Sequence, residues 1–597
     1  MKERLVTVSI AVLLLMVALV ACGPAPASVE DAEVVLSTEA QIPPPAPPAP
    51  AEPVTLDSYS ASEIPTLDPQ LADDVLSVNY VENLFVNLTN LAPDGLELLP
   101  EAATGWQGSE DGLAYTFALR TDIPWVQHDP ETGETRQVLD EGGNPRFVTA
   151  HDFAYAIKRA CDPNLGSYYS SVVAPVIKGC EAVLYFEDPA AVPPELVEAI
   201  GVSAPADDML IIELEFPASY FLSMTPMWTL AATPEWAIEE HGETWIEPEN
   251  IVTSGRYVLH EWQRGVGNSL WRNPLMPQDM RGRGNIERVM TRVVPELSTG
   301  YALWLENEVD ITAIPDLELQ AHLDQFPEET RQAPDLAVLY FGFALDKPPF
   351  DNVHVRRAFS AAFDRQTYSD EVLQGQCLPM VHFAPPGIFG APPIDEVGVG
   401  FDPEYAREQL AEAGYPDCEG FPQVTLLTFS GQGPQHEAEY AQAQWEEHLG
   451  CSLDLIQIEQ LPFREQMEAV EAPAEDRPHM WASGWAPDYP DENNWVGDVL
   501  WCKSPENPRR RECSALDALI VEAREEPDPE RRIALYRQIE EGFFGPEGEM
   551  PFAPTCTQVG YGAVHLWLDP GPLELFSGVH WYDWTIDWKV KQAAQGD

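Results

Sequence analysis

Two kinds of hydrophobic pattern run along the chain. Residues 114–120 (AYTFALR) alternate large apolar residues with smaller or polar ones, and 210–216 (LIIELEF) follow the same rule, so both predict strands. The segments 424–429 (VTLLTF) and 452–459 (SLDLIQIE) also have strand-like composition. Because helical patterns lie between and around these later strands, the second half of the chain predicts an α/β layer.

Three segments in the second half show the spacing of amphipathic helices. The segment 351–375 carries an apolar stripe that begins after Asp351 or Asn352 and is expected to stop at Gly375. The segments 402–415 and 528–544 both open with Asp-Pro, which supplies a cap and a proline at the first helical position. The stripe expected in the last segment is Ile533, Tyr536, Ile539 and Phe543.

Residues 484–495, GWAPDYPDENNW, fit neither pattern. Two tryptophans and a tyrosine stand among prolines and acidic residues, which predicts a loop. Exposed aromatic surface in a loop indicates a binding site. The alternative is that Asp488 and Asp491 cap a turn while the tryptophans belong to the core.

The N-terminus predicts export. Residues 1–22 combine a charged start, an apolar run and a small-residue cleavage site, which indicates a signal peptide. The sequence Leu-Val-Ala-Cys at 19–22 resembles the bacterial lipobox, so we expect acylation at Cys22; a plain signal anchor is the alternative. Residues 23–53, rich in Pro and Ala, predict a linker. The expected location is the cell envelope, either the periplasm or the outer surface, with lipid as the anchor.

Charge and motifs narrow the possible functions. The chain has 98 Asp plus Glu against 33 Lys plus Arg, a formal charge of −65, which argues against nucleic acid and anionic membrane surfaces as partners. The charge fits a cationic or zwitterionic ligand, or a need for solubility in a particular habitat. No catalytic, nucleotide-binding or metal-binding motif was found, so we expect no enzymatic activity, no cofactor and no metal.

Cysteine usage agrees with export. Besides Cys22 the chain contains eight cysteines, and an even number in an exported protein predicts disulfides. The pairs closest in sequence are Cys161 with Cys180 and Cys502 with Cys513. A zinc site is disfavoured because no paired C-x-x-C or nearby histidine cluster accompanies them.

Several segments, taken in order, resemble one family. They are PTLDPQLADDVLSVNYVENLFVNLTNLAPDG (65–95), LPEAATGWQGSEDGLAYTFALRTDIPW (99–125), FVTAHDFAYAIKRACDPN (147–164), IVTSGRYVLHEWQRG (251–265), KPPFDNVHVRRAFSAAFDR (347–365), YAREQLAEAGYP, GWAPDYPDENNW and the acidic helix expected to end near Phe544. Together they are similar to extracellular solute-binding proteins of family 5, the oligopeptide- and dipeptide-binding lipoproteins of peptide ABC importers.

The resemblance implies an α/β fold of the periplasmic-binding-protein type, with two lobes, a hinge and a third, smaller inserted domain. The implied division assigns 54–90, 206–314 and 546–597 to lobe I, 91–205 to the small domain and 315–545 to lobe II. A peptide or other small solute would bind between the lobes and pass to a membrane permease. A monomer is expected.

The resemblance also implies ligand contacts. The Trp-x-x-Asp-Tyr spacing of Trp485, Asp488 and Tyr489 matches a cleft-wall segment of the family in which the aspartate takes the ligand's α-ammonium group. Further expected ligand-binding residues are Gly484, Tyr340, Tyr169, Glu63 and Ile64. The last two belong to SEIPTLDP (62–69), expected to pair as an extended edge with the ligand backbone; Tyr340 and Tyr169 are alternatively ordinary core or surface residues.

The chain departs from the family pattern in two places. Before Gly484 some oligopeptide binders carry an arginine that helps to hold the ligand's carboxylate, whereas this chain reads Met480-Trp481-Ala482-Ser483. An insertion also lengthens the early domain between Trp125 and Phe147. Because some members of the family bind other solutes, an oligosaccharide receptor is the main alternative. An exported hydrolase or an adhesion lipoprotein is an alternative of a different class.

Overall fold

The computed structural model describes residues 52–93, 95–504, 510–572 and 578–596. The expected signal peptide with Cys22, and nearly all of the linker 23–53, lie outside the described residues. Within the described ranges, no helix is both long and apolar enough to cross a membrane. The described residues form one compact unit.

A four-stranded sheet holds the first strand of the chain against strands from much later in the sequence. Its order is β1 (Thr55–Ser60), β13 (Arg288–Val293), β12 (Gly267–Arg272) and β11 (Tyr257–Gln263). Strand β1 runs parallel to β13, with Leu56 opposite Val289, and both side chains are fully buried. Helix α1 (Val75–Leu84) packs into the same core, and Asp74 caps it by accepting a hydrogen bond from the Ser77 N–H.

A second sheet comes from the segment between β1 and β11. It is antiparallel, in the order β4 (Ala103–Gly108), β5 (Ala114–Leu119), β9 (Met209–Glu213) and β8 (Val202–Ala206). Strands β5 and β9 confirm the two strands predicted here, although β9 ends at Glu213 rather than at Phe216. Helix α2 (Ala150–Ala160) lies against β8 and β9, and its start is fixed by a capping box between Thr149 and Asp152.

Shorter elements complete the first half of the chain. Strands β2 (Thr89–Leu91) and β3 (Leu98–Pro100) pair with each other, and β6 (Val126–Asp129) pairs with β7 (Glu134–Gln137) and β10 (Val252–Thr253). The short helices are α3 (Ser170–Val173), α4 (Cys180–Leu184), α5 (Pro194–Glu198), α6 (Phe221–Met224) and α7 (Glu235–His241). The insertion noted after Trp125 therefore contains the hairpin of β6 and β7.

The third sheet is mixed and belongs to the second half of the chain. Its order is β14 (Ile311–Ala313), β20 (Phe552–Val564), β15 (Thr330–Phe343), β19 (Met480–Trp485), β17 (Val424–Phe429) and β18 (Ile456–Leu461), with β16 (Cys377–Pro379) paired to β20. Strand β17 runs parallel to β18 and to β19, and helix α13 (Gln432–Leu449) connects β17 to β18. The expected α/β layer is confirmed, but the strand predicted from residue 452 begins only at Ile456.

The predicted helices correspond to α10 (Val353–Ala361), α12 (Pro403–Glu412) and α16 (Pro529–Phe544). Asp402 and Asp528 cap the last two, as predicted. Helix α10 ends long before Gly375, because Asp364 accepts hydrogen bonds from two following N–H groups and starts a new helical turn. Ile533 is 44% exposed, so its assignment to the buried stripe of α16 was wrong, whereas the other three stripe residues are buried.

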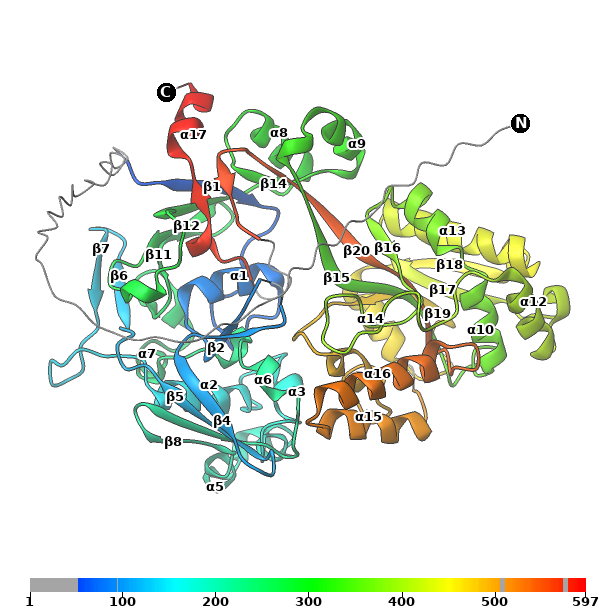
Figure 1. Ribbon diagram of the computed structural model, residues 1–597, viewed down its shortest axis with the longest axis horizontal. Coiled ribbons are helices and arrows are strands. Elements are labelled where there is room, and N and C mark those ends of the chain that lie inside the picture. Colours follow the sequence, from blue (N-terminus) through cyan, green and yellow to red (C-terminus); the bar gives the residue numbers. More distant parts are fainter. Residues whose placement is uncertain (1–51, 94, 505–509, 573–577, 597) are drawn as a thin grey trace, which may run out of the picture. The chain divides into compact units, whose positions relative to one another are not determined.

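The remaining helices are α8 (Leu297–Leu305), α9 (Asp316–Gln325), α11 (Arg365–Thr367), α14 (Phe463–Glu471), α15 (Ala515–Glu525) and α17 (Trp588–Gln595); β21 (Leu568–Asp569) pairs with β22 (Thr585–Ile586). Figure 1 places α10, α12 and α13 beside the third sheet and shows α15 alongside α16.

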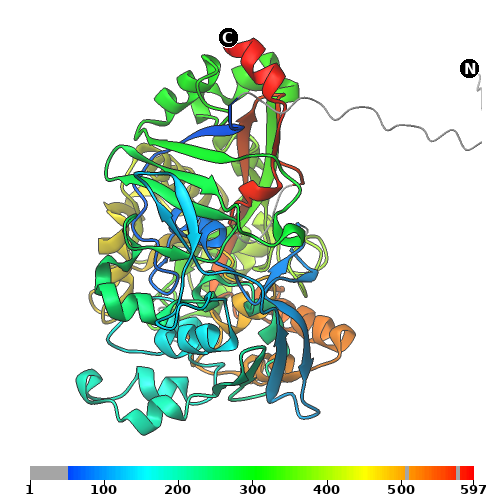
Figure 2. The same ribbon diagram turned by 90° about the vertical axis from the view of Figure 1, so that its left-hand side faces the viewer.

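Two long strands, β15 and β20, lie next to each other in the third sheet. Strand β20 also pairs with β14, the strand that follows the first sheet in the sequence. Strands β15 and β20 lie side by side in both views (Figure 1 and Figure 2) and are antiparallel, with Phe341 opposite Ala553. Their register shifts twice, between Pro334 and Val338 and again between Leu339 and Tyr340. Strand β20 lies within 546–597, the segment assigned to lobe I from the sequence, but it belongs to the same sheet as β17 and β19. The domain boundaries expected from the sequence stay a prediction.

Candidate functional site

A cavity of 840 Å³ is lined by side chains from both halves of the chain. From the first half come Asp73, Tyr168, Tyr169 and Tyr220. From the second half come, among others, Tyr340, Phe463, Trp485, Asp488, Asp498 and Arg524. Small-molecule sites typically have volumes of about 300–1,000 Å³, so the cavity has the size of a ligand site.

The loop that follows β19 shapes one wall of the cavity. The chain leaves the strand at Trp485, and prolines at 487 and 490 exclude a regular helix before the short helical turn at Asn493–Gly497. Asn494 folds back on this loop. Its Oδ1 accepts a hydrogen bond from the Asp488 N–H at 2.9 Å, and its Nδ2 donates to Asp488 Oδ2 at 3.0 Å. The loop therefore fixes both the backbone and the carboxylate of Asp488.

Tyr169 reaches the same carboxylate from the other half of the chain. Its hydroxyl donates to Asp488 Oδ1 at 3.1 Å, and its ring packs edge-on against Trp228 with 4.7 Å between ring centroids. Burial, followed by the nearby Asp488 charge, raises the pKa of the Tyr169 phenol. The phenol consequently stays protonated near neutral pH and acts as a donor to Asp488.

Tyr489 and Asp498 form a buried pair beside Asp488. The Tyr489 hydroxyl donates to Asp498 Oδ2 at 2.5 Å, and the Tyr489 ring stacks on that of Tyr220 with 5.5 Å between centroids. Asn494 Nδ2 also donates to Asp498 Oδ2, at 3.1 Å, so one amide connects the two carboxylates. Burial raises the pKa of the Asp498 carboxyl. Asp498 was not among the ligand-binding residues expected from the sequence, yet it lines the cavity.

The cavity brings together most of the ligand-binding residues expected from the sequence: Asp488, Trp485, Tyr489, Tyr340, Tyr169 and Gly484. Tyr340 is only 6% exposed and stacks on Phe552, so most of its ring is core. At Gly484 an added Cβ would lie 3.0 Å from a Leu339 methyl, so strand β15 approaches closely there. The ligand contacts themselves stay predictions.

Glu63 and Ile64 lie elsewhere. Neither lines the cavity, and residues 62–69 form no strand. The Glu63 carboxylate accepts a hydrogen bond from the Gly265 N–H at 2.6 Å, and Ile64 is 3% exposed within the core. The expected pairing of this segment with the ligand backbone therefore stays a prediction without support from the cavity.

Residues 97–503, more than half of the chain, match the profile of a family described as bacterial extracellular solute-binding proteins, family 5 Middle. The chain belongs to this family. The expected family membership is confirmed, and the family is one of binding proteins rather than enzymes.

Relatives of this family 5 protein align with it over most of the length of both chains. The probable deoxycholate-binding periplasmic protein YgiS of Escherichia coli strain K12 is 28% identical over 482 residues, which are 80% of this chain and 83% of the relative. The periplasmic oligopeptide-binding protein OppA of the same strain is 27% identical over 498 residues, 82% of this chain and 85% of the relative.

A solved structure supports the fold. The unliganded open form of the periplasmic murein tripeptide-binding protein MppA has a TM-score of 0.71 and 23% identity, and the match covers 90% of this chain and 98% of that chain. The expected fold class is confirmed: an α/β fold of the periplasmic-binding-protein type, with two lobes and a third, smaller domain.

The family 5 protein also has cavity residues that the sequence did not suggest. The Arg524 guanidinium lies over the ring of Phe216 at 3.8 Å and faces that of Trp501 at 4.9 Å. The Arg524 carbonyl accepts a hydrogen bond from the Ser219 N–H at 2.9 Å. Phe216 and Ser219 come from the first half of the chain, so Arg524, which lines the cavity, joins the two halves of the chain beside it.

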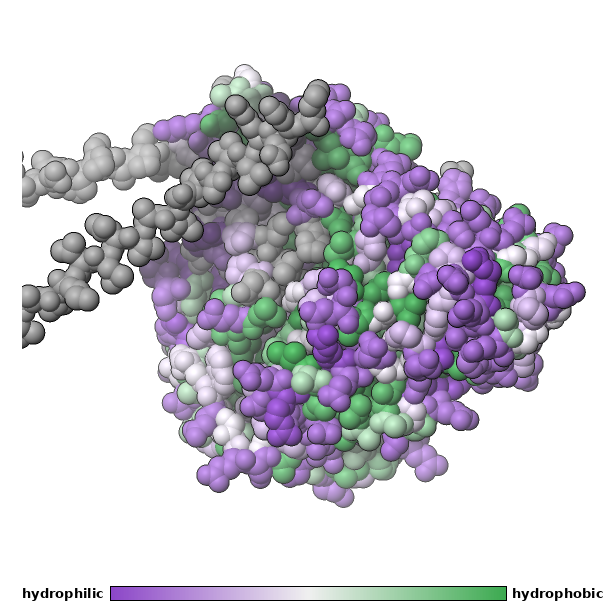
Figure 3. Space-filling model, turned by 45° about the vertical axis from the view of Figure 1, so that its right-hand side comes forward, coloured by the Kyte–Doolittle hydropathy of each residue, from purple (hydrophilic) through white to green (hydrophobic). Residues whose placement is uncertain are grey.

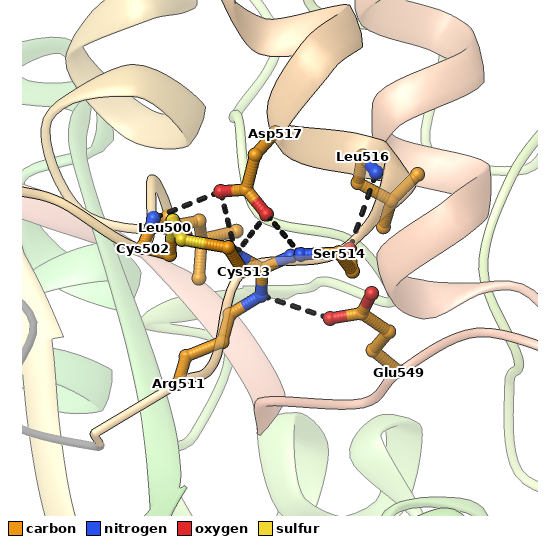
Figure 4. Close-up of a disulfide and its surroundings, with 8 residues drawn as sticks. All are labelled: Leu500, Cys502, Arg511, Cys513, Ser514, Leu516, Asp517 and Glu549. Carbon is orange, nitrogen blue, oxygen red and sulfur yellow. Dashed lines mark hydrogen bonds and ion pairs between the residues drawn. A yellow bond between two sulfur atoms is a disulfide. The ribbon is translucent and has the colours of Figure 1, made fainter.

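A disulfide lies beside the part of the cavity wall that Trp501 and Ser504 form. Cys502 and Cys513 are bonded, and Asp517 accepts hydrogen bonds from the Cys502 N–H and from Arg511 (Figure 4). Trp501 and Ser504, beside Cys502, line the cavity. This disulfide and Cys161–Cys180 confirm the two pairs suggested by sequence spacing, and Cys377–Cys556 and Cys418–Cys451 complete the eight cysteines.

The same cysteines bear on metal binding. Within the described residues, the one cluster with metal-ligand spacing is Cys502, Cys513 and Asp517. Both of its sulfur atoms are in the disulfide, and a metal-binding thiolate would require that bond to be broken. The cluster is therefore a structural anchor.

Proposed function

We propose that this family 5 protein is the substrate-binding component of an ABC importer, which captures peptides in the 840 Å³ cavity and delivers them to a membrane permease. The observation that carries the proposal is the position of Asp488, whose carboxylate is held by Asn494 and Tyr169 at the cavity wall. The name of its relative OppA, an oligopeptide-binding protein, supports peptides as the ligand class.

In this proposal, Asp488 receives the α-ammonium group of the peptide. A carboxylate held by hydrogen bonds at the wall of a cavity is already oriented, and the contact with an ammonium group is a charge-assisted hydrogen bond, which is stronger than a neutral one. Tyr169 and Asn494 would share the carboxylate with the ligand. Tyr489 and Trp485, on either side of Asp488 in sequence, would bound the ligand near its amine.

Closure of the site is proposed to involve contacts between the two sides of the cavity. Tyr169 with Asp488, Tyr220 with Tyr489, and the Ser219 N–H with the Arg524 carbonyl each join the first half of the chain to the second. A ligand that binds while these contacts are in place would be shielded from water. The permease would then bind the closed form.

A second candidate ligand class is an apolar or sugar-like solute. Aromatic rings of Trp485 and Trp501 line the cavity, which suits a flat apolar or sugar surface. One relative is named as a probable deoxycholate-binding protein. The expectation of an oligosaccharide receptor belongs to the same candidate.

The anchoring of the protein is part of the proposal. The sequence Leu-Val-Ala-Cys at 19–22 supports acylation of Cys22 after export, with the Pro/Ala-rich linker 23–53 as a spacer. We expect a labelled fatty acid to mark the expressed chain and to be absent from the Cys22→Ser variant. Equal labelling of the variant would contradict the lipid anchor.

A thermal-shift experiment tests the ligand class. A ligand that binds only the native protein raises its unfolding free energy by about 2.7 kcal/mol at 100 times its Kd. We expect mixed short peptides to raise the melting temperature, and cello-oligosaccharides and deoxycholate to have no effect. A shift with deoxycholate or sugars but not with peptides would favour the second candidate.

A further inference from the structure

The insertion between Trp125 and Phe147 meets the first sheet through two histidines. His128, on β6, is 3% exposed, and its Nε2 lies 3.0 Å from Nδ1 of His260 on β11. Its Nδ1 lies 2.9 Å from the hydroxyl of Thr135, the residue opposite His128 on β7. Figure 1 shows β6 beside β11, although the two strands are far apart in the sequence. We call β6 and β7 with their turn, residues 126–137, the insertion hairpin; it does not line the cavity.

A β-bulge and an aromatic ring place His260 at this contact. The register between β11 and β12 shifts between Leu259 and Glu261, so His260 is the extra residue of a bulge, and bulges redirect side chains. The His260 ring stacks on Trp271 of β12, with 3.9 Å between centroids and 24° between planes. At the turn of the hairpin, a Cβ added to Gly133 would lie 3.0 Å from the Trp271 ring, so the turn also packs closely on this tryptophan. The two histidines and Trp271 therefore hold the insertion hairpin against the first sheet.

The contact between the two imidazole rings restricts their protonation states. Two ring nitrogens 3.0 Å apart form a hydrogen bond when one donates its N–H and the other accepts with its lone pair. When both rings are protonated, every ring nitrogen carries a hydrogen, so the hydrogen bond is lost and two positive charges face each other. The contact therefore requires at least one neutral ring.

The charged side chains around the pair come from four strands; they are Asp129 on β6, Glu134 and Arg136 on β7, Glu261 on β11 and Arg288 on β13. Glu134 and Arg136 form an ion pair with each other at 2.5 Å. Burial lowers the pKa of His128 to about 4; repulsion from His260 adds to this effect, and the Asp129 charge opposes it. Burial also lowers the pKa of His260, where the Glu261 charge opposes and the Arg288 charge adds. The surroundings thus favour neutral rings while the hairpin is attached.

Histidine is the side chain whose ordinary pKa lies between pH 5 and pH 8. On the face shown in Figure 3, hydrophilic residues cover much of the surface, and the chain has 98 Asp plus Glu against 12 His. Exposed carboxylates have ordinary pKa values near about 4 and stay ionised above pH 5. Beside the pair, hydrogen bonds from Thr132 lower the pKa of Asp129, so this carboxylate also stays ionised there. A response of the insertion hairpin in this pH range therefore comes from its histidine contact.

We propose that the His128–His260 contact is an acid-sensitive attachment of the insertion hairpin, which is attached when at least one ring is neutral and detached when both are protonated. Detachment frees the outer part of the hairpin from Trp271, while its first residues stay paired with β10, where Val126 lies opposite Thr253. The inference goes beyond the proposed function and does not depend on it, because the contact lies outside the cavity.

The direction of the response follows from the lowered pKa. In the detached form a histidine has its ordinary pKa of about 6.5, whereas His128 in the attached form has a pKa of about 4. The attachment is therefore at full strength above about pH 6.5 and is lost as the pH falls toward about pH 4. For one histidine with these two values, detachment becomes about thirtyfold more favourable between about pH 7.5 and about pH 5.

Hydrogen–deuterium exchange tests the attachment. Exchange of the backbone amides of residues 126–137 is followed by mass spectrometry in the purified chain at about pH 7.5 and about pH 5, with correction for the intrinsic exchange rates. We expect the protection of this segment to fall at least about tenfold at the lower pH. The hairpin of β4 and β5, residues 103–119, contains no histidine and is the internal control, so its protection is expected to change less than about threefold. A fall in 126–137 no larger than in the control segment would overturn the inference.

Substitutions assign the response to the two rings. An amide in His128→Gln lies near the position of Nε2 and one in His260→Asn near that of Nδ1, so the double variant keeps two hydrogen-bonding groups but no titrating ring. We expect its protection at 126–137 to change less than about threefold between the two pH values, and His128→Gln alone to lose most of the response. His151→Asn is the matched control, because His151 on α2 is 62% exposed, and we expect it to respond as wild type does. A tenfold fall that persists in the double variant would overturn the inference.

Discussion

Asp488 and Asp491 belong to the same loop but have different surroundings. Asp491 is 2% exposed, forms an ion pair with Arg532 at 2.8 Å and accepts a hydrogen bond from the Tyr536 hydroxyl at 2.9 Å. Asp488 lies at the cavity wall, where Tyr169 and Asn494 hold its carboxylate. The comparison indicates that position relative to the cavity, rather than residue type, separates a structural carboxylate from a candidate ligand contact.

The largest expected effect is on stability, at Asp491. Asp491→Asn leaves the buried Arg532 charge without its carboxylate, and removing one partner of a buried pair costs about 3–5 kcal/mol. We expect urea unfolding to show a loss of this size, with Asp488→Asn close to wild type. Equal losses in the two variants would remove the distinction between the two aspartates.

The second effect is on ligand affinity, at Asp488. Removing one partner of a buried charged contact costs about 2–5 kcal/mol, so we expect Asp488→Asn to weaken peptide binding at least about thirtyfold. The control is Asp395→Asn, because Asp395 is exposed and does not line the cavity. Asp498→Asn is a poor control, because Asp498 lines the cavity and shares Asn494 with Asp488. Calorimetry with a tight-binding peptide measures these changes.

The third effect concerns a neighbouring buried acid. Glu492 is fully buried, and neither of its carboxyl oxygens has a hydrogen-bond partner among the described residues. Burial, with the nearby Glu540 charge, raises the pKa of Glu492 well above its ordinary value. Because the folded protein holds the Glu492 proton more tightly than the unfolded chain does, this proton stabilises the fold. The stabilisation is complete at a pH below the unfolded-state pKa, and it is lost as the pH rises through the folded-state pKa.

We therefore expect Glu492→Gln to flatten the decline in unfolding free energy toward high pH, by up to about 1.4 kcal/mol per pH unit. Urea unfolding at a series of pH values measures the slope. Glu468→Gln, at a side chain that is 70% exposed, is expected to leave the slope as in wild type. Parallel curves for Glu492→Gln and wild type would contradict the raised pKa.

The smallest expected effect is at Tyr169. Tyr169→Phe removes one donor to Asp488 and a contact between the two sides of the cavity, and one hydrogen bond contributes about 1 kcal/mol. Peptide affinity is expected to fall about fivefold, clearly less than in Asp488→Asn. A loss as large as that of Asp488→Asn would shift the main role from the carboxylate to the phenol.

Local sequence signals predicted the parts of the fold and site that depend on short segments. The two Asp-Pro dipeptides predicted where α12 and α16 begin. The loop at 484–495 was predicted from its mixture of aromatic, proline and acidic residues. The stop of α10 was missed because the competing cap at Asp364 lay inside the expected helix. Ile533 was misplaced because a helical stripe shows which residues share a face but not how wide the buried strip is.

The other cavity walls could not be predicted from local patterns. Phe463, Tyr220 and Arg524 come from α14, from the turn before α6 and from α15, and their meeting depends on tertiary packing. Phe463 in particular has the sequence context of an ordinary amphipathic helix, and only its 69% exposure at the cavity distinguishes it. Glu63 and Ile64, in contrast, were carried over from a family pattern and lie outside the cavity.

The most direct test of the central claim combines Asp488→Asn with acetylation of the peptide amine. Calorimetry on the four combinations of wild type or variant with free or acetylated peptide gives the coupling energy between the two groups. If Asp488 holds the ammonium group, acetylation weakens binding strongly in wild type and only slightly in the variant, with a coupling of about 2 kcal/mol or more. Additive losses, with a coupling near zero, would contradict the assignment of Asp488 to the peptide amine.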